Sequence, residues 1–315
     1  MAQNGDTLLN YILQLDVRTP TPDASTDYLR AVVAVVKPKG ETPVGELTKV
    51  ISPEAAKSLT DNADVEQLFN AGMNSVLILP MSDLSAVGAA LSSVKERFYT
   101  LLISSDYTDD EVQELDIGTF PGVTAYAFTE QAAAKNFAAQ KNHCGFLTGN
   151  GNKAANMFYA FGELLSNSGW DNQQYIPLPK DDGIVDLGLA DDLFADRISF
   201  ALTSEEYGSR MAFFSAGGQA IIAPYVTQEL YINLQGGALR YLNINRPQYT
   251  LVQAKLLQDY LTSYANTRYV DTRLLAYVSI SIALTKSNYE GNITVAIPEP
   301  SALWRLKGIL TQEAL

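Results

Sequence analysis

The side chains that could perform chemistry are few, and the two most suggestive ones are neighbours in the chain. His143 is the only histidine and Cys144 the only cysteine. A cysteine nucleophile needs an imidazole within reach of its thiol, but adjacent residues of a strand point to opposite faces of a sheet. We therefore interpret Cys144 as a small buried side chain. A single histidine also leaves a transition-metal site dependent almost wholly on carboxylates.

A glycine-rich segment is the second candidate. Gly149 to Lys153 reads Gly-Asn-Gly-Asn-Lys, follows a strand-like run and precedes a helical pattern, which is where a phosphate cradle forms. Ala154 stands where a P-loop needs Ser or Thr, and the third glycine of a dinucleotide motif is missing. The segment therefore predicts a tight turn between strand and helix. A nucleotide- or sugar-phosphate-binding α/β enzyme is the alternative hypothesis built on it.

Paired carboxylates are the third candidate. A general acid needs a desolvated carboxyl group, whereas the four acidic pairs of this sequence stand in polar, turn-like contexts. No GxSxG nucleophile motif is present. We expect no catalytic residue, no metal site, no cofactor and no enzymatic activity. The four pairs are Asp109-Asp110, Asp181-Asp182, Asp191-Asp192 and Glu205-Glu206.

The charge of the chain limits its partners. A formal net charge of −13 opposes binding to phosphate backbones and to anionic membrane surfaces, because both need clustered Lys and Arg. We expect neither nucleic acid nor membrane as a partner. No apolar run is long enough to span a bilayer, and the N-terminus lacks a signal-peptide pattern. One cysteine excludes an intramolecular disulfide, which fits a reducing cytosol.

The elements that would position these side chains alternate between strand and helix from residue 28 to residue 200. Short continuous apolar runs predict strands buried on both faces, and segments of helical composition separate them. This alternation predicts an α/β domain with a layered, mostly parallel sheet. The predicted strands are 31–36, 76–79, 99–103, 123–128 and 145–148, and the predicted helices are 53–59, 65–71, 83–97, 109–115, 130–140 and 153–165.

Residues 201–315 have a different, α+β pattern and form a predicted C-terminal domain. Apolar residues at helical spacing, from Tyr249 to Tyr264, predict a long amphipathic helix between Gln248 and Asn266. Two alternating strands follow, with apolar faces over 278–284 and 293–297. Residues 287–291 are the predicted hairpin loop between these antiparallel strands.

Both ends of the chain have the period-two pattern of a half-buried strand. Residues 1–27 form a predicted N-terminal arm, in which a strand precedes a polar, Pro-containing linker. A last strand follows Pro298-Glu299-Pro300. Strand-like ends on linkers can pair with the sheet of another molecule. The predicted subunit-interface residues are Leu9, Tyr11, Leu13 and Leu15 at one end, and Trp304, Leu306 and Leu310 at the other.

Three parts of the sequence together resemble the tail-sheath proteins of tailed phages. They are Tyr99–Ser104 opening a strand–helix unit, the helix from Asn152 to Ser166 followed by Trp170–Tyr175, and a C-terminal third that closes with Leu303–Gly308. The resemblance implies a structural virion protein, assembled in the host cytoplasm as a homo-oligomer. It implies terminal arms that add strands to neighbouring sheets and knit subunits into a helical tube around an inner tail tube.

The length of the chain is the one departure from this family. At 315 residues it is short for a contractile sheath, so a non-contracting sheath or another tail component is compatible with the sequence. A third hypothesis, beside the sheath subunit and the enzyme, is a monomeric binding module or chaperone-like adaptor in a phage-like setting.

Overall fold

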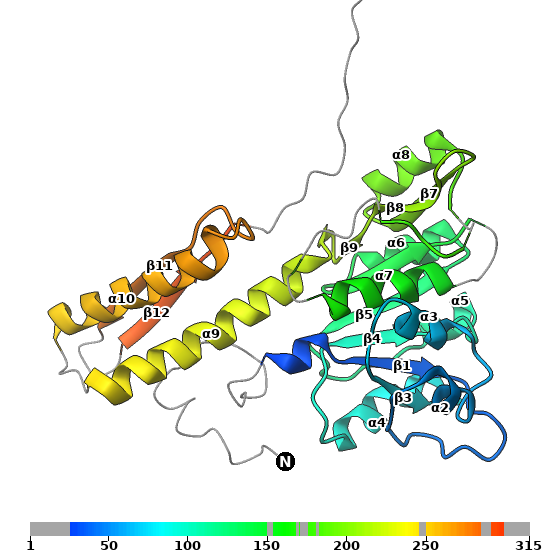
Figure 1. Cartoon of the computed structure of the whole chain (residues 1–315), viewed down its shortest axis with the longest axis horizontal. Helices are drawn as coiled ribbons and strands as arrows, with labels where there is room; N and C mark the ends of the chain where they lie inside the picture. Colours follow the sequence, from blue (N-terminus) through cyan, green and yellow to red (C-terminus); the bar gives the residue numbers. More distant parts are fainter. Residues whose placement is uncertain are drawn as a thin grey trace, which may run out of the picture.

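The computed structural model describes residues 26–149, 154–167, 170, 176–180, 183–245, 250–284 and 291–298. Figure 1 shows an α/β body, residues 26–221, from which one long helix leads into an elongated C-terminal unit, residues 222–298. Within the described ranges, none of the helices combines the length and apolar character needed to span a bilayer.

An eight-stranded sheet forms the centre of the body, in the order β2-β3-β1-β4-β5-β6-β7-β8. The six strands from β3 to β7 in this order run parallel, and the two edge strands are antiparallel to their neighbours. The predicted mostly parallel sheet is therefore confirmed. The strands are β1 (Val32–Val36), β2 (Thr48–Val50), β3 (Val76–Pro80), β4 (Thr100–Ile103), β5 (Val123–Phe128), β6 (His143–Leu147), β7 (Ser199–Ser204) and β8 (Gly208–Phe213).

Helices cover both faces of this sheet and create two apolar cores (Figure 1). One face packs against α2 (Pro53–Lys57), α3 (Asp64–Asn70) and α7 (Ala155–Ser166). The other face packs against α4 (Val87–Ser93), α5 (Asp109–Gln113), α6 (Gln131–Ala138) and α8 (Leu187–Ala195). Five adjacent inner strands, β3, β1, β4, β5 and β6, are buried along their whole length, as continuous apolar runs predict.

Local signals explain where several helices begin. Ser52 and Thr108 accept hydrogen bonds from backbone N–H groups of the first turns of α2 and α5, and Thr108 forms a capping box with Glu111. The predicted helix over 83–97 is shorter than expected: a 3-10 turn, η2 (Leu84–Ala86), precedes α4, which ends at Ser93. Asp83 caps that turn through Ser85 N–H.

The strand pair β7 and β8 extends the sheet beyond residue 200, where the sequence placed a domain boundary. That boundary falls inside β7, so the sheet includes residues assigned by sequence to the next domain. A short ribbon of β9 (Ser215–Ala216) and β10 (Gln219–Ala220) then leads to α9 (Ile222–Asn245). The body therefore reaches Ile221 before the chain enters the C-terminal unit.

Helix α9 has no counterpart in the sequence-based prediction. Its buried residues include the polar Gln228, Glu229 and Gln235 as well as apolar ones, so burial does not follow a single apolar stripe. Pro224 lies in its first turn, where a missing backbone N–H costs nothing. Because α9 is buried on several sides, its sequence lacks the single apolar stripe by which an amphipathic helix is predicted.

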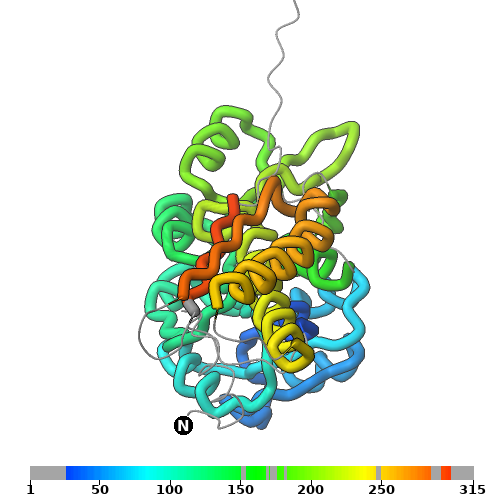
Figure 2. Tube along the Cα trace, turned by 90° about the vertical axis from the view of Figure 1, so that its left-hand side faces the viewer, coloured from blue at the N-terminus to red at the C-terminus, as the bar shows by residue number. Residues whose placement is uncertain are grey.

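The C-terminal unit is completed by α10 (Leu251–Ala265), a π-helical turn η3 (Asn266–Val270), and the hairpin of β11 (Ser279–Leu284) and β12 (Gly291–Ala296). The predicted amphipathic helix and the two predicted strands are present. Figure 2 shows α10 lying between α9 and the hairpin, and α10 packs against both α9 and β11. The apolar core of this unit is continuous with that on one face of the body.

Candidate subunit interface

The β11–β12 hairpin is a sheet of only two strands. It is antiparallel, with register running from Ser279 opposite Ala296 to Leu284 opposite Gly291. Ile280 and Ile282 on β11 and Ile293 and Val295 on β12 pack toward the core, whereas the serines and threonine between them are exposed. This alternation matches the sequence-based prediction. An isolated two-stranded hairpin is marginally stable in water, and here α10 supports the apolar face of the hairpin. Its two long edges are where further strands could be added.

The two long edges of this hairpin differ. On β11, the backbone N–H of Ile282 donates to the side-chain oxygen of Gln258 on α10 at 3.2 Å. On β12, no element in the described part of the chain hydrogen-bonds to the outer backbone edge. Unpaired strand edges are templates for β-strand addition by another chain.

Large apolar side chains are exposed where α9 ends and α10 begins. Ile244, Leu251 and Val252 are 73%, 77% and 68% exposed, and Leu256 follows one turn later at 48%. Exposed apolar side chains that gather in one region are typical of protein contact surfaces. The far end of the C-terminal unit therefore has the character of an interaction surface.

A buried polar cluster fixes the C-terminal unit to the body. Glu229 on α9 accepts hydrogen bonds from Arg268 Nη2 at 2.8 Å, Tyr269 OH at 3.4 Å and Trp170 Nε1. Trp170 stacks on Tyr225 with ring centroids 5.0 Å apart, and the Arg30 guanidinium lies 4.3 Å from the Trp170 ring. The cluster joins residues from the start of the body, from the segment after α7, from α9 and from η3.

The adjacent His143 and Cys144 point to opposite faces of β6 and do not form a catalytic pair. His143 packs edge-on against Phe137, with centroids 4.6 Å apart, and its Nδ1 lies 3.0 Å from Lys141 O. Cys144 lies in the other core, with Sγ 3.5 Å from Ser199 Oγ. Burial raises the pKa of the Cys144 thiol to about 12 and lowers the pKa of His143. A protonated thiol is a poor nucleophile.

The other sequence candidates do not converge on a site either. Asp109 starts α5, and its Oδ2 accepts from Thr129 N–H, Thr129 Oγ1 and Glu130 N–H at 2.9–3.0 Å, so it holds the turn before α6. Asp191 and Asp192 lie on α8, and Glu205 and Glu206 lie in the exposed β7–β8 turn. Asp181, Asp182 and residues 150–153 of the glycine-rich segment lie outside the described residues. Among the residues that are described, no His, Cys, Asp and Glu cluster could hold a metal ion.

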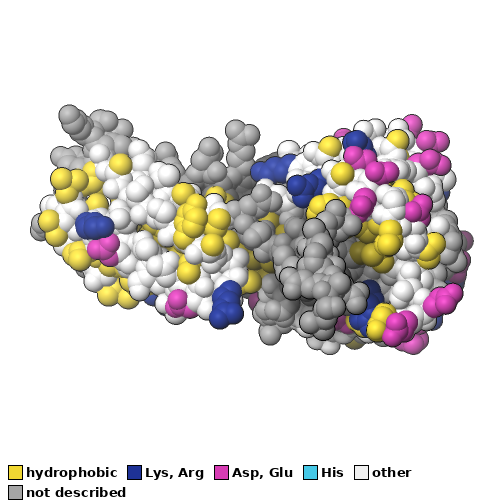
Figure 3. Space-filling model, turned by 90° about the horizontal axis from the view of Figure 1, so that it is seen from above, with side chains coloured by type: hydrophobic (Ala, Val, Ile, Leu, Met, Phe, Trp, Pro, Cys, Tyr) yellow, Lys and Arg dark blue, Asp and Glu magenta, His cyan; other side chains and the backbone are white. Residues whose placement is uncertain are grey.

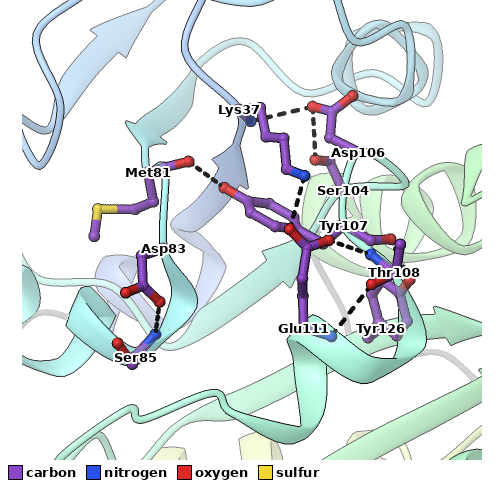
Figure 4. A network of polar contacts seen from close by, with 10 residues as sticks. All are labelled: Lys37, Met81, Asp83, Ser85, Ser104, Asp106, Tyr107, Thr108, Glu111 and Tyr126. Atoms are coloured by element: carbon purple, nitrogen blue, oxygen red, sulfur yellow. Dashed lines mark hydrogen bonds and ion pairs between the residues drawn. The ribbon is translucent and has the colours of Figure 1, made fainter.

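The crevice where an open α/β sheet binds ligands is filled by the protein's own side chains. The chain passes from β1 to β3 on one side and then crosses from β3 to β4 on the other side of β1, so the switch point lies at the carboxyl ends of β1 and β4. There Asp106 Oδ2 accepts from Lys37 N–H and Ser104 Oγ, both at 3.1 Å (Figure 4). Lys37 Nζ is itself bound to Glu111 at 2.8 Å.

A second carboxylate occupies the same crevice. Asp64 Oδ2 accepts from Ser105 N–H at 2.8 Å and from Ser105 Oγ at 2.6 Å, and burial raises its pKa. A phosphate placed here would meet two carboxylates, and the nearby lysine is already paired. A cavity of about 490 Å³ lies instead at the amino ends of β1 and β3, and its lining carries charges of both signs. The geometry therefore does not favour the nucleotide-binding hypothesis.

The predicted subunit-interface residues cannot be placed on this surface. Leu9, Tyr11, Leu13, Leu15, Trp304, Leu306 and Leu310 all lie outside the described residues. Their interface role stays a prediction. No local sequence pattern indicates the Glu229 cluster, because its members come from four separated parts of the chain.

Comparison with known proteins gives fold relatives only. Neither a protein-family model nor a curated protein matches the sequence. A chain from the baseplate of the anti-feeding prophage has a TM-score of 0.68 and 12% identity, covering 92% of this chain and 94% of that one. A chain from the contracted helical sheath of the same particle has a TM-score of 0.60 and 13% identity, covering 93% and 95%. The sheath tail protein Lin1278 from Listeria innocua has a TM-score of 0.51 and 8% identity, covering 87% and 96%.

These matches define the class of fold: an α/β body with an α+β C-terminal unit, as found in tail assemblies. The chain has the fold of tail-sheath proteins, and the resemblance seen in the sequence is confirmed at the level of fold. It also spans 95% of a chain from a contracted sheath, so its length gives no reason to set it apart from sheaths that contract.

Proposed function

We propose that this chain is a non-enzymatic structural subunit of a virion tail sheath. Its copies polymerise in the host cytoplasm into a helical tube around an inner tail tube. The observation that carries the proposal is the two-stranded β11–β12 sheet of the C-terminal unit, in a chain with a sheath fold. The terminal segments of neighbouring copies complete this sheet.

The number of strands and edges supports an exchange between copies. Each chain has two strand-like ends, residues 9–17 and 302–310, and each β11–β12 sheet has two outer edges. In a polymer of identical copies, each subunit must on average accept as many strands as it donates. Two donated strands and two outer edges therefore balance, so every copy can be linked to its neighbours through both of its ends.

The sequence between β12 and the last predicted strand favours donation to another copy. Ile297-Pro298-Glu299-Pro300 places a residue before proline twice, and such residues prefer extended backbone over turns. An extended linker leads a strand away from its own hairpin. The N-terminal linker, residues 19–27, also contains two prolines, and so provides reach at the other end.

The charge distribution supports contacts between copies through the C-terminal unit. Residues 26–221 contain 13 Lys and Arg against 26 Asp and Glu, whereas residues 222–298 contain six against four. Figure 3 shows acidic side chains gathered over the body and sparse over the C-terminal unit. Like-charged bodies repel one another, so the weakly charged unit with its exposed apolar residues is the surface where copies meet. The three parts predicted from the sequence then have distinct roles: the terminal arm donates a strand, the α/β domain forms the body, and the C-terminal domain forms the contacts between copies.

Paired substitutions on the last predicted strand test the proposal. Leu306→Ser removes an apolar residue from the alternating face, whereas the matched control Lys307→Ser changes the opposite face of the same segment. We expect Leu306→Ser to remain folded and monomeric by circular dichroism and sedimentation velocity, but to form no tubes in electron micrographs. Lys307→Ser should form tubes as the wild type does. Unchanged tubes from Leu306→Ser, and from a second variant with Leu13→Ser, would contradict strand exchange.

A further inference from the structure

One backbone group on the edge of the β11–β12 sheet is already engaged by a side chain. The Ile282 N–H points away from β12 and donates to Gln258 Oε1 at 3.2 Å. Gln258 lies in the middle of α10, which packs against β11. The Gln258 side chain therefore binds the outer edge of β11 near the middle of the strand.

The register shows what the rest of this edge offers. Because Ile282 N–H faces outward, Ile282 and Ile293 are a non-hydrogen-bonded pair. Every second residue along each strand, counted from this pair, also directs its backbone N–H and C=O groups to the outer edge. On β11 these are Ile280 and Leu284, and on β12 they are Ile293 and Val295. A strand added at β11 must bond to Ile282 N–H, at the centre of its ladder. On β12, no described side chain holds an equivalent group.

We infer that Gln258 guards the β11 edge: it satisfies the central edge N–H in the free subunit and is displaced when a terminal strand of a second copy docks there. The inference rests on the proposed strand exchange and goes beyond it, because it makes the two edges unequal. The occupant is a second copy, since each chain has two strand-like ends for two edges. Proteins protect exposed strand edges in this way to suppress premature pairing.

The guard imposes an order on assembly. A neighbour's strand can pair with β12 without breaking any described hydrogen bond, so that edge is filled first. Pairing at β11 follows and exchanges the Gln258 bond for a backbone bond. The second step is thus slower and weaker than the first, and free subunits stay monomeric until several neighbours contribute strands.

Removing the guard should make the free subunit more prone to assemble. In Gln258→Ala, water alone solvates Ile282 N–H before docking, so docking no longer breaks a protein hydrogen bond. One such bond between neutral groups has a net worth of about 1 kcal/mol, which converts to about fivefold in an association constant. We expect the critical concentration for tube formation, measured by pelleting of the full-length chain, to fall about fivefold. The lag before light scattering rises should shorten.

Two further variants separate a guard from a general effect on α10. Gln258→Glu keeps an acceptor oxygen, so its critical concentration should equal or exceed that of the wild type. Gln253→Ala truncates another glutamine of α10 and should change the critical concentration less than twofold. Hydrogen exchange provides a second readout on monomers: the Ile282 amide should exchange about fivefold faster in Gln258→Ala than in the wild type, but not faster in Gln258→Glu.

The outcomes distinguish this inference from the proposed function. If wild type and Gln258→Ala form tubes at the same critical concentration, the guard is refuted and strand exchange stands. If Gln258→Glu assembles as readily as Gln258→Ala, the acceptor oxygen is irrelevant and the guard is also refuted. If neither the wild type nor any variant forms tubes, the proposed function fails and the guard fails with it.

Discussion

Replacing Glu229 by Gln should loosen the C-terminal unit from the body. The carboxylate of Glu229 is 11% exposed and receives hydrogen bonds from Arg268, Trp170 and Tyr269. Glutamine keeps one acceptor oxygen but loses the charge, so Arg268 loses its ion-pair partner and the bond from Trp170 becomes one between neutral groups or is lost. Charge-assisted bonds have a net worth of about 1.5–3 kcal/mol and neutral ones about 0.5–1.5 kcal/mol.

The size of the effect follows from these two bonds. The loss of about 1 kcal/mol at each would give about 2 kcal/mol. The Arg268 side chain is 49% exposed, so solvent screens its ion pair and reduces the total to roughly 1–2 kcal/mol. For a chain of 315 residues, this corresponds to a decrease in melting temperature of about 2–3 °C.

Urea denaturation followed by far-UV circular dichroism measures this change. The chain has two tryptophans, so a Trp304→Phe background leaves Trp170 as the reporter of the cluster itself. Its emission should shift to longer wavelength in Glu229→Gln, because the indole loses its buried partner. The control Glu206→Gln lies in an exposed turn and should change stability by less than about 0.5 kcal/mol. Equal stability of the two variants, with unchanged Trp170 emission, would refute the role assigned to the cluster.

Three further substitutions or modifications test the body. Gly162→Ala should destabilise the body by about 1–3 kcal/mol in urea titrations, because the added Cβ would lie 2.6 Å from Ala71 Cβ, between α7 and α3. The control Gly236→Ala has open space around the added Cβ on α9 and should not destabilise the protein. Equal effects of the two substitutions would contradict this packing. Cys144 should not react with a thiol reagent in the native protein and should react on denaturation; stoichiometric native labelling would show that its burial is wrong. Because burial raises the pKa of Asp64 in the folded state, its contribution to stability is present at pH below its unfolded pKa and is lost as pH rises through the folded pKa. Asp64→Asn should therefore gain stability relative to wild type as pH rises above the unfolded pKa of about 4, and a parallel pH dependence of the two proteins in urea titrations would contradict this sign.

The sequence predicted those parts of the fold whose burial is simple. Strands such as Val32–Val36 and Val123–Phe128 are buried on both faces, so their apolar runs are unbroken. The β11 and β12 strands are buried on one face, and strict alternation identifies them. Helix α9 was not predicted, because Glu229 and Gln228 are buried and hydrogen-bonded to residues from distant parts of the chain. No local sequence pattern indicates such partners.

The candidate interface was predictable only in kind. Alternation at Leu9–Leu15 and Trp304–Leu310 indicates strand-like ends, but pairing partners are long-range and leave no mark on local sequence. The Gln258 contact to Ile282 joins residues 24 positions apart in the chain, so it needed the structure. The contact between Lys37 and Asp106 in the crevice also needed the structure. The sequence shows only that a ligand-binding motif is missing, whereas the structure shows which side chains occupy the crevice.

The most direct measurement of the central claim is an electron cryomicroscopy structure of tubes assembled from the full-length chain, at a resolution that traces backbone between subunits. It should show each β11–β12 hairpin flanked on both sides by strands from two other copies, one containing Leu13 and the other containing Leu306. A hairpin that stays two-stranded, or one extended only by the terminal segments of its own chain, would contradict the account.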